Sequence, residues 1–489
     1  MLVSRLRSSS RLAVAAVIAA VFLGALDQTV IVAALPAVVT DLRIPFDRLD
    51  QAAWIVSGYL LGYTVALPVM GRVADVRGRR LTLAVSLAIF AVGSLGCALS
   101  WSLASLVVAR VFQAAGGGAL LPVAIAVISD RSPVDRRALG IGIVGAIAEA
   151  GGVLGPLYGA AIISWLDWRW IFWINVPIAL LLLAIAVGGL EETGARGGRI
   201  DLVGAGLIAL ALGLPIAGLA HEAVVVASLD VRNGLLALAA VALAGFVGWE
   251  ARAKDPLLDV RLFRRADFAA AIVGGILLGG ALIVAMVDVP LFAATILNAS
   301  AADGGLLLMR LTAFIPAGAV LGGALAQRAG SRLPAALGFI VAAAGLGTMS
   351  AWGTVPAQSL LWESLAIAGL GFGLLIAPLA TSAVDAGGTD RAASAAALFS
   401  VARLIGMTVG LSILTAWGLQ QFDSLAGSIP LPLPKVGESV ASSQARLAAY
   451  NQTILQIGAE VYHDIFLAAA AICVVGLLAA VFLRATRSA

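Results

Sequence analysis

The chain has 489 residues, of which 61% are hydrophobic and only 12% charged, and its mean hydropathy is +1.04. Soluble globular domains carry about 25% charged residues, so this composition excludes an ordinary soluble fold. The net charge of +4 comes from arginines in short loops that form no continuous basic patch, so we expect no nucleic-acid partner.

Several kinds of chemistry are excluded by scarce residue types. The chain has only two lysines, and neither follows a Gly-rich loop, which excludes nucleotide hydrolysis by a P-loop. The two histidines, His221 and His463, lie far apart in polar segments, so we expect no metal site and no cofactor. Cys97 and Cys473 lie inside apolar runs and are interpreted as small hydrophobic residues rather than as a disulfide.

Apolar runs of bilayer length follow one another along the whole chain. A membrane-spanning helix needs about 20 mainly apolar residues. This criterion predicts an all-α polytopic membrane protein with fourteen spans, over residues 12–39, 52–70, 81–99, 103–128, 138–164, 170–190, 202–220, 234–250, 268–296, 305–326, 334–351, 361–383, 392–419 and 462–483.

The arginines predict the orientation of these spans. If the N-terminus is cytoplasmic, most of the arginines fall in cytoplasmic loops and few in outer loops, as the positive-inside rule requires. We therefore expect both termini in the cytoplasm and a multi-pass protein of the cytoplasmic (plasma or bacterial inner) membrane.

Asp27 and Arg110 both fall in the outer half of their spans, in the first and fourth predicted helices. Placing a charged side chain in mid-bilayer costs about 2.5–3.5 kcal/mol on insertion scales. Charged residues at this depth are therefore expected to form ion pairs or to have a functional role. Asp288 and Arg310 share an outer level in the second half of the chain, and Glu149 and Arg403 lie at similar depths. We predict proton-coupling roles for three acids, each with an arginine as ion-pair partner, namely Asp27 with Arg110, Glu149 with Arg403, and Asp288 with Arg310. The alternative is that these pairs only hold helices together.

A charged turn separates the second and third predicted spans. It runs from Gly71 to Arg80 (the signature turn), and its aspartate can accept hydrogen bonds from arginines or from helix-end amides. We predict a cytoplasmic latch formed by Gly71, Asp75, Gly78, Arg79, Arg80 and Arg131. A solvated loop charge at Asp75 is the alternative.

The fifth predicted span carries a run of small residues followed by a proline. Gly151, Gly152, Gly155, Pro156 and Gly159 permit close helix contact and a bend. Ordinary packing by small residues would use the same residues.

Two segments of the second half repeat patterns of the first. Gly323–Arg332 resembles the signature turn, with Gln327 at the position of Asp75, and Ala402–Gly406 resembles Ala148–Gly152. Internal repeats of this size are typical of secondary transporters. They predict a six-helix bundle over residues 12–190, an inserted two-helix linker over 191–265, and a second six-helix bundle over 266–489.

The last outer loop is predicted to run over residues 420–461. Its proline-rich stretch, Ile429–Pro434, is expected to be extended. Ala441–Gly458 is expected to form an amphipathic helix on or above the outer membrane face, with an irregular connector as the alternative.

Several of these segments together resemble the motifs of one family. The set is similar to the fourteen-span drug:proton antiporter branch of the major facilitator superfamily, on the segments Leu26–Pro36, Gly71–Arg80, Arg110–Gly118, Gly151–Gly159 and Trp168–Pro177. The chain looks most like mycobacterial exporters of drugs and triacylglycerides on the segments Val287–Val289, Gly406–Gly410 and Ala416–Gly418 and on the long final outer loop. The resemblance implies that the fifth-helix motif seals leaks between the two halves, and Gln327 implies that only the first copy of the signature turn forms a charged latch.

The resemblance and the buried charges imply a secondary transporter that is not an enzyme. We expect it to export lipophilic compounds, drugs or lipids such as triacylglycerides, by alternating access driven by proton antiport. A periplasmic lipid-carrying protein is a possible partner. The alternative is a proton-coupled nutrient importer of the same fold. A membrane enzyme is disfavoured, because the sequence shows no nucleophile elbow and no carboxylate–histidine cluster.

Overall fold

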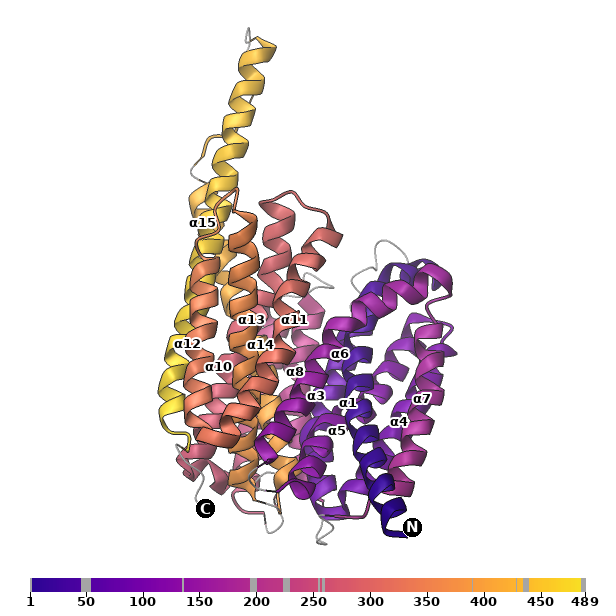
Figure 1. The fold of residues 1–489 in the computed structure, drawn as a ribbon. Helices are drawn as coiled ribbons and strands as arrows, with labels where there is room; N and C mark the ends of the chain where they lie inside the picture. Colours follow the sequence, from indigo (N-terminus) through magenta and orange to yellow (C-terminus); the bar gives the residue numbers. More distant parts are fainter. Residues whose placement is uncertain are drawn as a thin grey trace. The chain divides into compact units, whose positions relative to one another are not determined.

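The computed structural model describes residues 2–44, 54–133, 136–193, 200–222, 229–253, 256, 260–388, 390–427, 429–433 and 439–484. Every regular element in these ranges is helical, which confirms the predicted all-α class (Figure 1). Thirteen helices within them are long and apolar enough to cross a membrane. The remaining predicted span, 202–220, coincides with a helix whose described apolar stretch covers Leu202–Leu214. The total of fourteen and the side on which the termini lie stay predictions.

The helices follow the chain in a simple order. The first six are α1 (Leu2–Asp41), α3 (Trp54–Arg77), α4 (Arg79–Ala98), α5 (Leu103–Arg131), α6 (Arg137–Trp165) and α7 (Trp170–Gly189). The segment predicted to be an inserted linker holds α8 (Leu202–Glu222), α9 (Leu229–Glu250) and the short 3₁₀ helix η2 (Val260–Arg264). The last six are α10 (Ala266–Thr295), α11 (Ala301–Ala329), α12 (Arg332–Met349), α13 (Gln358–Gly387), α14 (Ala392–Ala426) and α15 (Val440–Val481).

Two compact units divide the chain. The first holds Met1–Ala271 together with Leu379–Val401, which is the end of α13 and the start of α14. The second holds Ile272–Pro378 and Ala402–Ala489. The predicted three-part division by internal repeat stays a prediction.

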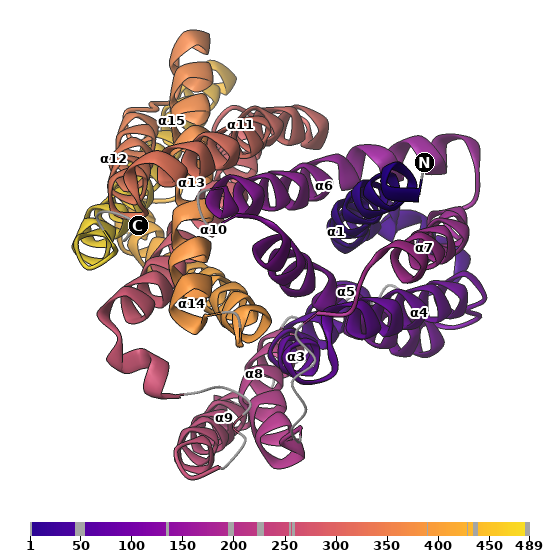
Figure 2. The same ribbon diagram turned by 60° about the horizontal axis from the view of Figure 1, so that its bottom comes forward.

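In the first unit, α1 packs along α6, and α5 packs between α3 and α4 (Figure 2). The inserted helices α8 and α9 pack on each other, and α8 also lies against α3. Gly213 of α8 permits this approach, because a Cβ there would lie 3.0 Å from Leu61 Cδ1. The inserted pair is therefore attached to the helix that ends in the signature turn.

In the second unit, an aromatic cluster joins α10 to α15 near the C-terminal end of α10. Phe292 packs against Trp352 and Tyr462, with ring centroids 5.0 and 5.4 Å away, and Trp352 packs against Phe466 at 5.4 Å. The Tyr462 hydroxyl lies 3.1 Å from the hydroxyl of Thr295. These contacts fix the level at which α15 passes the end of α10.

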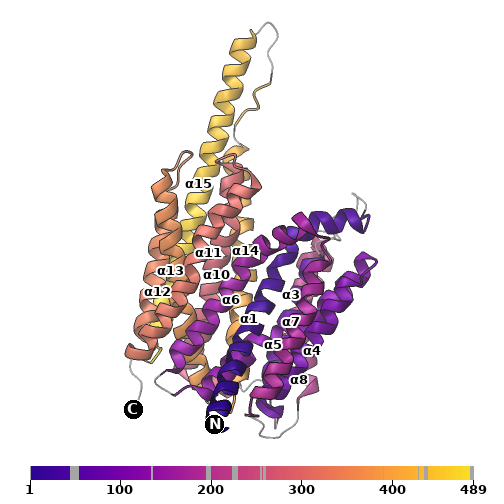
Figure 3. The ribbon, with the colours of Figure 1, turned by 45° about the vertical axis from the view of Figure 1, so that its right-hand side comes forward.

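Helix α15 differs from the sequence prediction. The predicted separate helix over Ala441–Gly458 is helical, but it continues without a break into the last span, and α14 extends to Ala426 (Figures 1 and 3). At 1.5 Å per residue, its 42 residues measure about 63 Å, roughly twice the hydrocarbon thickness of a bilayer. Most side chains between Val440 and Gln456 are exposed.

The two cysteines are free and fully buried, as expected from their apolar neighbours. Cys97 lies in α4 and Cys473 in α15. Within the described residues, no group of three or more histidine, cysteine, aspartate or glutamate side chains is placed to hold a metal ion.

Candidate functional site: a buried carboxylate cluster and a helix-end latch

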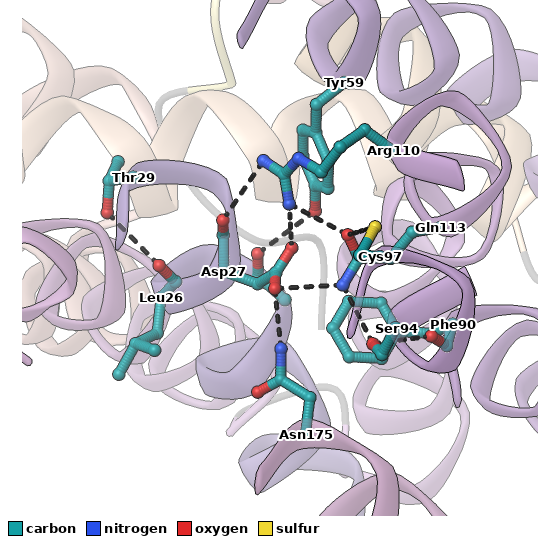
Figure 4. Close-up of polar contacts among 11 residues, drawn as sticks. Leu26, Asp27, Thr29, Tyr59, Phe90, Ser94, Cys97, Arg110, Gln113 and Asn175 are labelled. Carbon is teal, nitrogen blue, oxygen red and sulfur yellow. Dashed lines mark hydrogen bonds and ion pairs between the residues drawn. The ribbon is translucent and has the colours of Figure 1, made fainter. Parts of the chain in front are cut away.

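Asp27 lies in the middle of α1, and its side chain is 0% exposed. Arg110 of α5 donates from Nη1 to Asp27 Oδ2 at 2.8 Å, so the structure brings the predicted pair together (Figure 4). Two amides complete the shell of donors around the other oxygen. Gln113 donates from Nε2 to Asp27 Oδ1 at 3.0 Å, and Asn175 of α7 donates from Nδ2 to the same atom at 2.6 Å. We call these four residues the Asp27 cluster.

Arg110 is held by aromatic faces as well as by the acid. Its guanidinium carbon lies 4.1 Å from the ring centroid of Tyr59 and 5.7 Å from that of Phe172. A cation over an aromatic face is stabilised by about 0.5–2 kcal/mol, more when water is excluded. Desolvating two charges costs several kcal/mol each, so a pair this deeply buried needs all of these contacts.

Gln113 is fixed at both ends of its amide. Its oxygen accepts from Arg110 Nη1 at 2.8 Å and from the Cys97 thiol at 3.7 Å. Its nitrogen also donates to Ser94 Oγ at 2.8 Å, and the Ser94 hydroxyl in turn donates to the Phe90 carbonyl. The orientation of Gln113 is therefore determined by the network.

Asn175 is held differently. Its side chain is almost fully buried, yet its Oδ1 has no hydrogen-bond partner among the described residues. Its only described side-chain hydrogen bond is the one to Asp27.

The structure does not bring Asp288 and Arg310 together. Arg310 lies over the ring of Trp362, with its guanidinium carbon 4.1 Å from the centroid, and faces the amide of Gln358. Asp288 is 7% exposed, and no ion pair or hydrogen bond of its carboxylate is found among the described residues. Equal depth in two helices does not make two side chains point toward each other.

Glu149 and Arg403 belong to different units. Glu149 is half-buried on α6, and Arg403 is half-buried on α14. An ion pair between them would connect the two units, and this pairing stays a prediction.

Three glycines of the fifth-span motif face α1. A Cβ at Gly151, Gly155 or Gly159 would lie 2.7 Å from a backbone carbonyl oxygen of α1, that of Phe22, Leu26 or Val30 respectively. Close backbone contact of this kind is how helices pack tightly in lipid. Gly152 meets nothing within 4 Å at its Cβ position, and Pro156 is exposed. The motif therefore serves the α1–α6 contact through every fourth residue.

Thr29 of α1 contacts the same motif through its hydroxyl. Pro156 has no amide hydrogen, so the carbonyl of Gly152, four residues earlier, has no helical donor. The Thr29 hydroxyl donates to this carbonyl oxygen at 2.8 Å. A Cβ at Gly155 would collide with the Thr29 hydroxyl, so glycine at this position makes the bond possible.

At the signature turn, Asp75 caps the first turn of α14. Its carboxylate accepts from the Ala393 amide at 3.2 Å, from the Ser394 amide at 2.9 Å, and from the Ser394 hydroxyl at 2.6 Å. A carboxylate at a helix N-terminus accepts hydrogen bonds from the free amides there and is attracted by the positive end of the helix dipole. Gly71 permits the approach, because a Cβ there would lie 2.8 Å from Ala397 Cβ.

Arg79 joins Asp75 to α5. Its Nη2 lies 3.1 Å from Asp75 Oδ1, and its Nε lies 3.1 Å from Asp130 Oδ2. The side chain is 1% exposed, and Nη1 also donates to the carbonyl of Ala74. Arg131, predicted as a latch residue, is the last residue of α5, and its neighbour Asp130 is the residue that pairs with Arg79.

Glu192, in the segment after α7, caps the start of α4. The helix begins after Gly78, which has no side chain to act as a cap. Glu192 instead accepts from the amides of Arg80 and Leu81 at 3.0 and 3.1 Å. Gly78 has φ +105°, a conformation that favours glycine, and a Cβ there would also displace the Glu192 carboxylate from the start of α4.

Thr193 adds two further bonds to this contact. Its carbonyl accepts from the Arg79 amide at 3.0 Å, and its hydroxyl donates to Asp130 at 3.0 Å. The segment that leads into the inserted helices is thus bonded directly to the signature turn.

At the C-terminal end of α1, Asp41 accepts from Arg169 at 2.7 Å and from the indole of Trp168 at 3.3 Å. The hydrogen bond from Arg169 lowers the pKa of Asp41 below its ordinary value of 3.8. Arg169 also lies over the Trp168 ring, 4.4 Å from its centroid. A cavity of about 540 Å³ opens beside these residues, between the ends of α1 and α6.

The residues of these networks that the sequence interpretation did not single out include Gln113, Asn175, Glu192 and Ser394. Gln113 and Asn175 lie inside the recognised motifs, and a polar amide in an apolar span is itself a signal of a buried partner. Glu192 and Ser394 are in a loop and at a helix start, where polar residues are common and give no such signal.

The long apolar helices and a charged network enclosed among them define a multi-pass membrane transporter. The chain belongs to the Major Facilitator Superfamily, whose family model matches residues 17–411. The predicted family is thereby confirmed, and the expected location in the cytoplasmic membrane agrees with it.

Curated relatives extend over nearly the whole chain. A triacylglyceride transporter of Mycolicibacterium smegmatis is 37% identical over 96% of this chain and 87% of its own length. A triacylglyceride transporter of Mycobacterium tuberculosis (strain H37Rv) is 37% identical over 96% of this chain and 94% of its own. One from Mycobacteroides abscessus is 39% identical over 85% and 84%.

Solved structures share the fold at low sequence identity. A human organic anion transporter matches with a TM-score of 0.61 and 16% identity, over 96% of this chain and 99% of that one. A proton:xylose symporter bound to 6-bromo-6-deoxy-D-glucose matches with a TM-score of 0.59 and 14% identity, over 95% of each chain. At these identities the likeness concerns the fold alone.

Proposed function

We propose that this transporter exports lipophilic compounds, drugs or lipids such as triacylglycerides, across the cytoplasmic membrane by alternating access driven by proton antiport. The cargo is supported by the relatives, which are named triacylglyceride transporters and align with 96% of the chain. The coupling is supported by one observation above all, the fully buried Asp27 paired with the buried guanidinium of Arg110.

Asp27 is suited to carry a proton because its two charge states make different contacts. As a carboxylate it accepts from Arg110, Gln113 and Asn175, and it neutralises the guanidinium. As a carboxylic acid it loses most of the attraction to Arg110. Uptake and release of the proton therefore change how tightly α1 is bound to α5.

The other predicted acids extend this scheme. Glu149 and Arg403 occupy repeat-related positions, and we propose that rocking of the two halves makes and breaks their pair. Asp288 is proposed as a further proton carrier. In this proposal the Asp75 contact with the start of α14 is the cytoplasmic latch, which releases when the cytoplasmic side opens.

We further propose that a periplasmic lipid-carrying protein receives the cargo when it is a lipid. The proposal of export is distinguished from that of nutrient import by the direction in which cargo moves relative to protons.

Reconstitution into liposomes tests the proposal. A fluorescent triacylglyceride and, in separate vesicles, a cationic dye are followed under pH gradients of opposite sign. Cargo is expected to move against the direction of proton flow. Asp27→Asn should abolish the effect of the gradient, while Asp423→Asn, the same change at an exposed position of α14, should keep it.

Two results would contradict the proposal. Cargo that moves in the same direction as protons indicates an importer. A gradient effect that persists in Asp27→Asn excludes Asp27 as the coupling acid.

A further inference from the structure

We propose that Asn175 serves both charge states of Asp27, donating to the carboxylate and, with its amide turned over, accepting from the carboxylic acid. This inference depends on the proposed function, because it requires that Asp27 takes up a proton. It assigns to Asn175 a positioning role in proton coupling.

The argument starts from the donors around Asp27. In the structure, every described side chain that bonds to the carboxylate is a donor, namely Arg110 Nη1, Gln113 Nε2 and Asn175 Nδ2 (Figure 4). This set of donors suits a carboxylate, which accepts hydrogen bonds but cannot donate one. A carboxylic acid also donates through its own O–H, and a buried O–H without an acceptor is unfavourable.

Two of the three partners cannot supply that acceptor. Arg110 has no acceptor atom. Gln113 has an amide oxygen, but turning it toward Asp27 would break its bonds with Arg110 and Cys97, and its nitrogen would lose Ser94.

Asn175 can turn without breaking any other described hydrogen bond of its side chain. Its Oδ1 has no partner among the described residues, and its Nδ2 bonds only to Asp27. A half-turn about the Cβ–Cγ bond exchanges the two atoms and places Oδ1 opposite Asp27 Oδ1. The acid then donates to Asn175, while Asp27 Oδ2 still accepts from Arg110.

The proton is accounted for within the cluster. It binds Asp27 Oδ1 when the acid forms and leaves from the same atom when the carboxylate returns, and Asn175 keeps its own protons throughout. Among the described residues, the other titratable groups that interact with Asp27 come from four of the helices packed around it, while α7 contributes only the neutral Asn175. They are Tyr59 of α3, Cys97 of α4, Arg110 of α5 and Tyr158 of α6.

Infrared difference spectroscopy of the reconstituted transporter tests this role. Spectra at acidic and alkaline pH are subtracted, and the carbonyl band of protonated Asp27 is assigned as the band lost in Asp27→Asn. Donation of a hydrogen bond lowers the stretching frequency of a carboxylic acid. In Asn175→Ala the band should therefore move to higher frequency.

Two further variants make the result specific. Asn175→Ser keeps a small group that can accept, so its band should lie between those of the parent and of Asn175→Ala. Asn451→Ala, the same change at an exposed position of α15, is the matched control, and the Asp27 band of this variant should stay in place. If Asn175→Ala does not fold, the Ser variant gives the same comparison. In the unsubstituted protein, carbon-13 asparagine labelling should reveal an amide band that changes with the charge of Asp27.

The outcomes separate this inference from the proposed function. An Asp27 band that stays in place in both Asn175 variants overturns the role of Asn175 and leaves proton coupling intact. The absence of any Asp27 band across the pH range overturns proton uptake by Asp27, and the inference with it.

Discussion

The hydroxyl of Thr29 donates to the carbonyl oxygen of Gly152, the acceptor that Pro156 leaves without a helical donor. A side chain of α1 thus replaces the helical hydrogen bond that the proline removes from α6. Prolines are tolerated in membrane helices where a side chain takes over the freed carbonyl in this way. The first-helix and fifth-helix motifs are therefore linked by one hydrogen bond.

This relationship predicts a double-mutant cycle. Thr29→Val leaves the Gly152 carbonyl without a donor and should destabilise the fold by about 1–3 kcal/mol, while Thr29→Ser should cost much less. In the Pro156→Ala background, residue 156 regains its amide and can bond to Gly152, so Thr29→Val should cost clearly less there. Unfolding experiments in detergent measure the free-energy cost of Thr29→Val in each of the two backgrounds. Equal costs in the two backgrounds would show that the bond has no role in stability.

Glu149 is predicted to be required for export. Glu149→Gln keeps the shape of the side chain but cannot change its charge, so export driven by a pH gradient should be lost while the amount of folded protein stays the same. Proteoliposome transport and size-exclusion chromatography measure the two quantities. Glu460→Gln, at an exposed position of α15, is the matched control. Unaltered export in Glu149→Gln would remove this residue from the mechanism.

Asp75 is predicted to protect the start of α14. Asp75→Ala removes the acceptor of the Ala393 and Ser394 amides, and loss of such a cap costs about 0.5–2 kcal/mol. Hydrogen exchange of these two amides should become faster, and export should fall because the latch no longer closes. Ser394→Ala removes only the hydroxyl bond and should have a smaller effect. Unchanged exchange at both amides would mean that Asp75 does not cap α14 in solution.

Glu192 is predicted to stabilise the start of α4 from a distant segment. Arg79 and Arg80 place positive charge at the helix N-terminus, where it is unfavourable, so the carboxylate should matter more here than at an ordinary cap. Glu192→Ala should speed hydrogen exchange at Arg80 and Leu81. The neighbouring variant Glu191→Ala serves as the control, and equal exchange in the two variants would count against the cap.

The contact of Asp41 with Arg169 predicts a pH-dependent stability. Folding lowers the pKa of Asp41 below 3.8, so ionised Asp41 stabilises the folded protein above about pH 3.8 and this contribution is lost as the pH falls through the folded-state pKa. Asp41→Asn should therefore lower the Tm at neutral pH, and the difference from the parent should close in acid. The effect should be below about 1 kcal/mol, because the pair is partly exposed. A difference that grows in acid would have the wrong sign for this account.

The sequence predicted the helices well because hydropathy reports the length of chain that lipid requires. It also predicted the Asp27–Arg110 contact from depth alone. The same reasoning was insufficient for Asp288 and Arg310, since depth says nothing about the direction in which a side chain points around its helix.

The extension of α15 was missed for a related reason. Hydropathy marks where a helix enters lipid, not where it begins. Residues 440–457 mix polar residues with good helix formers such as alanine, leucine and glutamine, and they continue the last span without a break. The partners of the signature turn, Glu192 and Ser394, were missed because they come from segments remote in the chain. Only the folded structure places them beside Asp75 and Arg80.

The burial of both native thiols makes this chain suitable for site-directed labelling without prior engineering. Cys97 and Cys473 are 0% exposed, so maleimides and spin labels should react only with a cysteine introduced on the surface. Reporter groups could then be attached to the otherwise natural sequence, and the proposed rocking of the halves could be tested by distance measurements in working transporters.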